Sequence, residues 1–161
     1  MKARDAVEAD AGPIARIYNE GIEDRLATFE TRPREPSDVL GWLCGRHPVV
    51  VVEADGEVVA WAGTVAYSPR DCYAGVAEVS IYVARAARDR GAGRMALKAV
   101  VERARARGFY KLTGKVFATN EASRRLLSSE GFNEVGTHLR HGKLGDTWVD
   151  VVLVERLIDG V

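Results

Sequence analysis

The chain is 161 residues long, which fits one domain with a single core. Its 23 Lys and Arg residues balance its 23 Asp and Glu residues, so composition predicts no attraction to nucleic acid or to a membrane surface. Two cysteines are too few for a disulfide framework or a cysteine metal site. No stretch approaches the roughly 20 apolar residues of a membrane span, and the first residues lack the apolar core of a signal peptide. We therefore expect a soluble, cytoplasmic protein.

The N-terminal part of the chain predicts one short strand and two helices. We expect the strand over residues 3–7. Apolar side chains then recur at helical spacing from about Asp10, and Gly21 is the expected end of that helix. Residues 24–36 show no clear period and read as a loop. A short helix should follow, with Ser37 as its N-terminal cap.

A hairpin and a buried strand are predicted next. Residues 49–54 and 57–66 are apolar runs joined by the dipeptide Asp55-Gly56, a strong signal for a two-residue hairpin turn. A turn-rich loop then leads to residues 76–83, where β-branched and aromatic side chains predict a buried strand.

The second half of the chain alternates helices and strands. Apolar spacing predicts a helix that Gly108 ends, a strand over residues 111–117 and a helix over residues 120–130. Two strands, over residues 133–140 and 147–157, complete the chain. The order β-α-α-β-β-β-α-β-α-β-β predicts an α/β (α+β) fold, with a mixed central sheet of about seven strands flanked by about four helices.

A basic, glycine-rich loop joins the buried strand to the following helix. Residues 88–94 read Arg-Asp-Arg-Gly-Ala-Gly-Arg, and Asp89 is the only acidic side chain among them. Free backbone N–H groups and the positive end of the helix dipole face such a loop and attract anions. We therefore expect a ligand that carries phosphate.

The loop sequence is also consistent with two other interpretations. Gly91, Gly93 and Ala96 satisfy the G-x-G-x-x-A pattern of dinucleotide-binding folds. Against that fold, the glycines lie well past Val83, a hairpin precedes the site, and the next strand offers lysines where a ribose-binding carboxylate is expected. The plainest alternative is a glycine loop that only turns the chain.

Two motifs resemble the landmarks of the GCN5-related N-acetyltransferase (GNAT) superfamily. Residues 88–93 match its Arg-x-x-Gly-x-Gly motif, and residues 120–132 resemble its asparagine helix that ends in Gly-Phe. The resemblance covers residues 1–161 and implies a single N-acetyltransferase domain that uses acetyl-CoA and no metal. It also implies a cofactor site in which backbone groups hold the pantetheine arm, the basic loop holds the pyrophosphate, and the asparagine helix makes further contacts. The residues so implied are Ile81, Tyr82, Val83, Arg88, Asp89, Arg90, Gly91, Ala92, Gly93, Arg94, Asn120 and Ser123.

Further segments are similar to the phosphinothricin and arsinothricin acetyltransferase branch of this superfamily. They are residues 27–33, 70–73, 77–83 and 141–151. The branch resemblance implies a homodimer that acetylates the α-amine of glutamate-like amino acids with tetrahedral side-chain heads, such as phosphinothricin, arsinothricin and methionine sulfone or sulfoximine. Such acetylation confers antibiotic or herbicide resistance.

The branch resemblance also implies residues that bind the acceptor. Arg70 and Tyr73 stand where the branch binds the head group, and a guanidinium suits an oxyanion head because it donates paired hydrogen bonds. We expect Phe29 to form a wall of the pocket and Glu30 to contact the α-ammonium. A packed phenylalanine and a solvated glutamate are equally consistent with the pattern.

Glu78 is the candidate general base. An α-ammonium must lose a proton before it attacks a thioester, and a carboxylate on a central strand is costly unless it is solvated or used. The branch resemblance places the catalytic glutamate at this position, although a paired glutamate at the rim is the structural alternative.

The proton for the departing thiolate has no equally clear source. Many superfamily members supply it from a tyrosine, and Leu127 stands at that position here. His141 is the candidate helper, or it is a plain surface histidine. The sequence is also consistent with two other functions: an acetyltransferase with another amine acceptor, such as a polyamine, antibiotic or peptide, and a non-catalytic acyl-CoA-binding module.

Overall fold

The structure, a computed structural model, describes residues 1–160 and contains one seven-stranded sheet with the strand order β1-β2-β3-β4-β5-β7-β6. The strands are β1 (Lys2–Asp5), β2 (Val49–Ala54), β3 (Glu57–Ala66), β4 (Val76–Val83), β5 (Lys111–Phe117), β6 (Asn133–Leu144) and β7 (Thr147–Leu157). The α-helices are α1 (Ala11–Asp24), α2 (Pro36–Leu40), α3 (Ala92–Ala106) and α4 (Glu121–Ser129).

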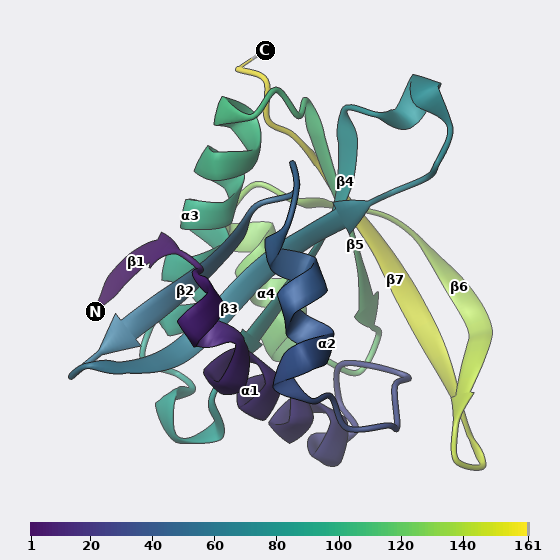
Figure 1. Cartoon of the computed structure of the whole chain (residues 1–161). Helices are drawn as coiled ribbons and strands as arrows, with labels where there is room; N and C mark the ends of the chain where they lie inside the picture. The colour runs from purple at the N-terminus through teal and green to yellow at the C-terminus, as the bar shows by residue number, and fades with distance from the viewer. Residues whose placement is uncertain (161) are drawn as a thin grey trace.

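Helices cover both faces of the sheet (Figure 1). On one face, α3 packs over the first strands around the fully buried Leu97, Phe109 and Leu112. On the other face, α1 and α2 enclose a second core that contains Ile14 and Trp61. The site described below lies on this second face.

The order of elements predicted from the sequence is confirmed. The turn between β2 and β3 places Asp55 at φ 52° and Gly56 at φ 81°, the left-handed conformations that a two-residue hairpin requires. The first strand lies one to two residues earlier than expected, and β6 runs four residues beyond residue 140. Five of the six strand pairs are antiparallel, so the sheet is not the parallel sheet of a dinucleotide-binding fold.

Two predicted helix ends are wrong. Gly21 does not end α1 but is buried within it, because the Tyr82 ring packs there and a Cβ at Gly21 would lie 2.9 Å from two ring carbons. Arg25, at φ 57°, ends the helix instead. Ser37 does not cap α2, since the cap is Glu35, whose backbone N–H donates to the Asp38 carboxylate over 2.8 Å.

The sheet splits between β4 and β5, the one parallel pair. The two strands are paired only over Val76, Ala77 and Glu78, opposite Lys111, Leu112 and Thr113. Beyond Glu78, β4 stays paired with β3, while β5 stays paired with β7. The split opens the middle of the sheet beside Glu78.

Several general features bear on function. Within residues 1–160, no helix combines the length and apolarity needed to cross a membrane. Cys44 and Cys72 are free and exposed. The same residues contain no group of three or more His, Cys, Asp or Glu side chains arranged to hold a metal ion.

Candidate functional site

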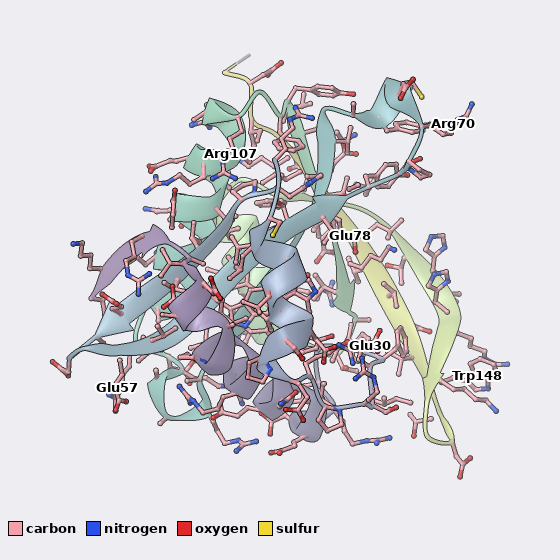
Figure 2. All side chains as sticks on the ribbon, in the orientation of Figure 1. Glu30, Glu57, Arg70, Glu78, Arg107 and Trp148 are labelled. Atoms are coloured by element: carbon pink, nitrogen blue, oxygen red, sulfur yellow. The ribbon has the colours of Figure 1, made fainter. Side chains whose placement is uncertain are left out.

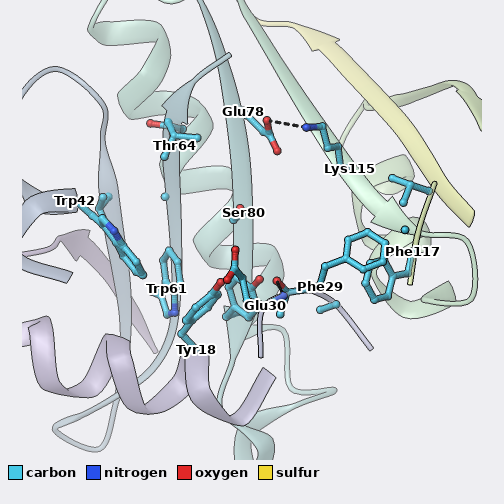
Figure 3. A pocket seen from close by; sticks show the side chains of 18 of the residues that line it. Tyr18, Phe29, Glu30, Trp42, Trp61, Thr64, Glu78, Ser80, Lys115 and Phe117 are labelled. Carbon is cyan, nitrogen blue, oxygen red and sulfur yellow. Dashed lines mark hydrogen bonds and ion pairs between the residues drawn. The ribbon is translucent and has the colours of Figure 1, made fainter. Parts of the chain in front are cut away.

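A cavity of about 600 Å³ lies at the split, on the face covered by α1 and α2. Because side chains alternate along a strand, Glu78, Ser80 and Tyr82 of β4 all point into it. Lys115 and Phe117 of β5 face it from the other side. Figure 3 shows the two strands separating, with Glu78 and Lys115 at one end of the cavity and Tyr18 toward the other.

The segment after α1 closes one side of the cavity. The Phe29 ring packs on the Phe117 ring with centroids 4.7 Å apart, so Phe29 is a wall of the cavity. Glu30 also lines the cavity, and its carboxylate accepts a 2.9 Å hydrogen bond from Arg34. That bond raises the pKa of the Arg34 guanidinium, so the arginine stays charged. Both Phe29 and Glu30 thus lie where the sequence predicted a pocket.

Aromatic rings form the far end of the cavity. Trp61 stacks on Tyr82 with centroids 5.2 Å apart, and Trp42 stacks on the other side of Trp61 at 5.7 Å. Tyr18 meets Tyr82 edge-on at 4.9 Å. Burial raises the pKa of the Tyr82 hydroxyl, so this hydroxyl stays uncharged at neutral pH.

Glu78 is half-buried, and its carboxylate faces a cation. The Glu78 Oε2 atom lies 3.7 Å from Lys115 Nζ, and the two side chains are 25% and 56% exposed. This distance is an ion pair but exceeds the length of a hydrogen bond. The carboxylate is therefore accessible from the cavity and free to accept a proton from a bound amine.

His141 reaches the cavity because β6 is bulged. Between the pairs His138–Val151 and Gly142–Val149, β6 advances four residues while β7 advances two. Arg140 takes φ 48° within this bulge. The His141 ring stacks on the His138 ring at 4.4 Å and lines the cavity.

The basic loop turns into the N-terminus of α3. Gly91, at φ 86°, is the N-terminal cap of the helix, and Asp89 takes φ 62°. Gly93 is buried where α3 meets β4 and α4, and a Cβ there would lie 3.2 Å from Val83 and 3.3 Å from Leu126. Gly93 therefore lets α3 pack closely on β4 and α4, and Gly91 supplies the left-handed turn that starts the helix.

Two arginines of the loop have acidic partners that the loop sequence does not contain. Arg88 pairs with Asp24 at 2.6 Å, and Arg94 pairs with Glu130 at 3.2 Å. Within the described residues, Arg90 has no such partner and is exposed. Of the three side chains, Arg90 is the one most available to an external anion.

The backbone of Ile81, Tyr82 and Val83 pairs with β3 on one side only. On the other side β5 has already separated, so the described residues supply no strand to pair with this edge. An extended ligand can add to such an edge as a strand would. The free edge and the α3 N-terminus fit a cofactor that combines an extended arm with phosphate groups, as acetyl-CoA does.

The asparagine helix is α4. Asn120 caps it, because the Asn120 Oδ1 atom accepts a 3.2 Å hydrogen bond from the backbone N–H of Ser123. Leu127 is 4% exposed and packs in the main core, so no proton donor stands at that position.

Arg70 and Tyr73 lie outside the cavity. Both belong to the loop between β3 and β4, and Figure 2 shows Arg70 at the outer end of this loop, away from Glu78. The Tyr73 ring contacts the Tyr67 ring edge-on at 5.3 Å. Within one copy of the chain, the structure does not bring the expected head-group residues to the candidate base.

Lys115 and Ser80 line the cavity but were missed as site residues. Ser80 lies two residues after Glu78, so strand alternation alone was enough to identify it. Lys115 had a weaker signal: a lysine in the middle of a strand that packs between two others, on the same face as Phe117.

A family model described as the acetyltransferase (GNAT) family matches residues 15–132. Among curated relatives, a phosphinothricin N-acetyltransferase of Streptomyces coelicolor is 31% identical, over 97% of this chain and 95% of the relative. An L-methionine sulfoximine/L-methionine sulfone acetyltransferase of Pseudomonas paraeruginosa is 30% identical, over 97% of this chain and 94% of the relative.

Solved structures that resemble this chain are also acetyltransferases. A GNAT superfamily phosphinothricin acetyltransferase from Sinorhizobium meliloti, in complex with acetyl-CoA, is 28% identical with a TM-score of 0.91, covering 98% of this chain and 88% of that one. A ribosomal-protein-alanine N-acetyltransferase from Brucella melitensis is 33% identical with a TM-score of 0.93, covering 98% and 99%. With its split sheet, glycine loop and asparagine helix, this chain belongs to the GNAT family of acetyltransferases.

Proposed function

We propose that this protein transfers the acetyl group of acetyl-CoA to the α-amino group of glutamate-analogue amino acids such as phosphinothricin, arsinothricin and methionine sulfone or sulfoximine. One observation carries the proposal: Glu78 faces a cavity that opens where β4 and β5 separate. The relatives named for phosphinothricin and for methionine sulfone support the acceptor class.

In the proposed reaction, the acceptor amine attacks the thioester carbonyl. A C–N bond forms, the C–S bond breaks, and the coenzyme A thiolate leaves. The proton that the acceptor ammonium must lose before the attack passes to Glu78, directly or through water. The second N–H proton, lost as the amide forms, passes to the departing thiolate or to solvent. A thiol has an ordinary pKa of about 8.5, so the thiolate is a tolerable leaving group without a dedicated acid. His141 lines the cavity and is the proposed helper.

A second candidate function is acetylation of a protein N-terminus. The similarity to the ribosomal-protein-alanine N-acetyltransferase favours it, since that structure matches this chain over nearly its whole length. The two candidates differ in one chemical respect: a free amino acid carries an α-carboxylate, whereas a peptide N-terminus carries an amide at the same position.

The proposal extends to a cytoplasmic homodimer that confers resistance to the acetylated compounds, with no metal, nucleic acid or membrane in the reaction. Exposed apolar side chains on β6 and β7 support an interface between copies: Val135, Leu139 and Trp148 are 58%, 75% and 53% exposed. Light scattering after size exclusion tests the dimer. Growth of a sensitive bacterium on phosphinothricin tests resistance, and unchanged turnover after EDTA tests metal independence.

The acceptor class is tested by thiol release from acetyl-CoA over a panel of acceptors. The panel contains phosphinothricin, arsinothricin, methionine sulfone, spermidine and a short peptide that begins with alanine. Turnover confined to the three amino acids supports the proposal. Turnover confined to the peptide supports the second candidate, and turnover of spermidine alone contradicts both.

A further inference from the structure

Lys115 is the only lysine or arginine among the described residues that line the cavity. The other charged side chains there are the carboxylates Glu30 and Glu78. Glu30 is already paired with Arg34. A zwitterionic amino acid that enters the cavity therefore meets Lys115, which can pair with its carboxylate, and the loosely paired Glu78, which can pair with its ammonium.

The position of Lys115 follows from the split in the sheet. The last residue of β5 that pairs with β4 is Thr113, and Lys115 is two residues further along on the same face. At this point β5 pairs with β7 through Leu153, and the side toward β4 is open. The lysine side chain therefore projects over the opening, where Figure 3 shows it turned toward Glu78.

Within the described residues, the Lys115 ammonium has hydrogen-bond donors without an acceptor. Glu78 is its one partner in the described residues, and at 3.7 Å the contact is too long for a hydrogen bond. A lysine ammonium carries three N–H donors. Another lysine on the same strand provides a contrast, since Lys111 lies 2.5 Å from Glu155 and does not line the cavity.

The spacing of the pair matches an α-amino acid. Two bonds join the amine nitrogen to the carboxylate carbon, so the two charged groups of an amino acid lie about 3 Å apart. Glu78 and Lys115 present opposite charges 3.7 Å apart. An acceptor with its amine at Glu78 consequently brings its α-carboxylate to Lys115, and its side chain extends toward the aromatic end of the cavity.

We propose that Lys115 binds the α-carboxylate of the acceptor and so selects free amino acids over amines and peptide N-termini. The inference rests on the proposed function, because it assumes an amino-acid acceptor whose amine faces Glu78. An acceptor that lacks the carboxylate gains nothing from Lys115, whereas a charge-assisted hydrogen bond to a carboxylate is among the stronger polar contacts in proteins.

The test compares Lys115→Met with the wild-type protein on three acceptors: methionine sulfone, its primary carboxamide and its decarboxylated amine. For methionine sulfone, the variant should raise KM about tenfold or more while kcat changes by less than threefold. For the carboxamide and the amine, KM should change less than twofold. Lys115→Arg should retain most of the affinity for methionine sulfone because it keeps the positive charge.

Lys111→Met is the matched control, since it removes a lysine from the same strand outside the cavity. Its KM for all three acceptors should equal that of the wild-type protein. Intrinsic fluorescence gives a readout independent of turnover, because Trp42 and Trp61 line the cavity. Methionine sulfone should change that fluorescence in the wild-type protein at lower concentrations than in Lys115→Met.

Two results would overturn the inference while leaving the proposed function intact. In the first, the wild-type protein acetylates methionine sulfone and Lys115→Met keeps its KM. In the second, Lys115→Met impairs the acid, the carboxamide and the amine equally, which is the behaviour of a residue that only orients Glu78. If the wild-type protein acetylates the carboxamide or the amine but no free amino acid, the proposed function and the inference both fail.

Discussion

The Phe29 ring lies against Gly142 so closely that a Cβ on Gly142 would stand 2.7 Å from two ring carbons. The glycine therefore lets the segment after α1 close over the end of β6. The same ring packs on Phe117 at 4.7 Å, so the contact fixes one wall of the cavity. A side chain at residue 142 would push this wall out of place.

Gly142→Ala tests this wall. Because a Cβ cannot fit beside the ring, Phe29 must move, and we expect KM for the acceptor to rise several-fold with a loss of about 1–3 kcal/mol in the free energy of unfolding. Gly136→Ala is the control on the same strand, since nothing lies within 4 Å of a Cβ there. Steady-state kinetics and urea unfolding measure the two effects, and equal behaviour of both variants would contradict the assignment.

Gly93→Ala tests the cofactor site. Its Cβ would lie 3.2 Å from Val83 and 3.3 Å from Leu126, so α3 must shift from β4 by a few tenths of an ångström. We expect KM for acetyl-CoA to rise several-fold while KM for the acceptor stays constant. Gly12→Ala, in α1 with open space around it, controls for the gain in helix propensity of about 1 kcal/mol.

Arg70→Ala tests the head-group prediction. If Arg70 binds the tetrahedral head, its loss removes charge-assisted hydrogen bonds, and KM for phosphinothricin should rise about tenfold. Arg107→Ala, which removes an exposed arginine at the end of α3, should leave that KM unchanged. Because Arg70 lies outside the cavity, an unchanged KM in Arg70→Ala would assign head-group recognition to the residues that line the cavity.

Asp10→Asn tests a buried ion pair beneath α1. Asp10 is 4% exposed and accepts two hydrogen bonds from Arg4, at 2.7 and 2.9 Å. These bonds lower the pKa of the Asp10 carboxyl below its ordinary 3.8. We expect the substitution to reduce the free energy of unfolding at pH 7 by about 1–3 kcal/mol.

The pH dependence of that difference follows from the lowered pKa. A carboxyl with a lowered folded-state pKa stabilises the protein fully above its unfolded-state pKa, and the contribution is lost as pH falls through the folded-state pKa. The gap between wild type and Asp10→Asn should therefore shrink below pH 3.8. Asp5→Asn, at an exposed ion pair with Arg103, should reduce the free energy of unfolding by less than about 1 kcal/mol. A similar reduction for Asp5→Asn and Asp10→Asn would contradict the role of burial.

Local patterns were enough to predict most of the fold. The hairpin at Asp55-Gly56 and the alternation along β4 depend on turn chemistry and on a period of two, both of which are visible in the sequence. The prediction at Gly21 is wrong because a glycine in the last turns of a helix resembles a helix end. The glycine is needed there for another reason: the Tyr82 ring, from a different element, leaves no room for a Cβ. Contacts between distant segments leave no local signal.

The site residues were likewise predictable from local patterns but not where they depend on contacts between distant segments. Glu78 was predictable because a carboxylate on a buried strand is unusual. Lys115 was not identified, since its meeting with Glu78 depends on where β4 and β5 separate, and pairing between distant strands is set by the whole sheet. The position of Arg70 outside the cavity likewise depends on the path of the β3–β4 loop, which its residue types do not specify.

Glu78→Gln tests the central claim most directly, because glutamine keeps the shape of the side chain but cannot accept the proton of the acceptor ammonium. The measurement is kcat for N-acetylphosphinothricin formation from acetyl-CoA at neutral pH, with the product identified by mass spectrometry. The wild-type protein should form this product, and the variant should lose about 10²-fold or more in kcat while its KM for acetyl-CoA stays unchanged. A variant that retains most of the wild-type kcat would contradict Glu78 as the base, and a wild-type protein that forms no N-acetylated amino acid would contradict the proposed function.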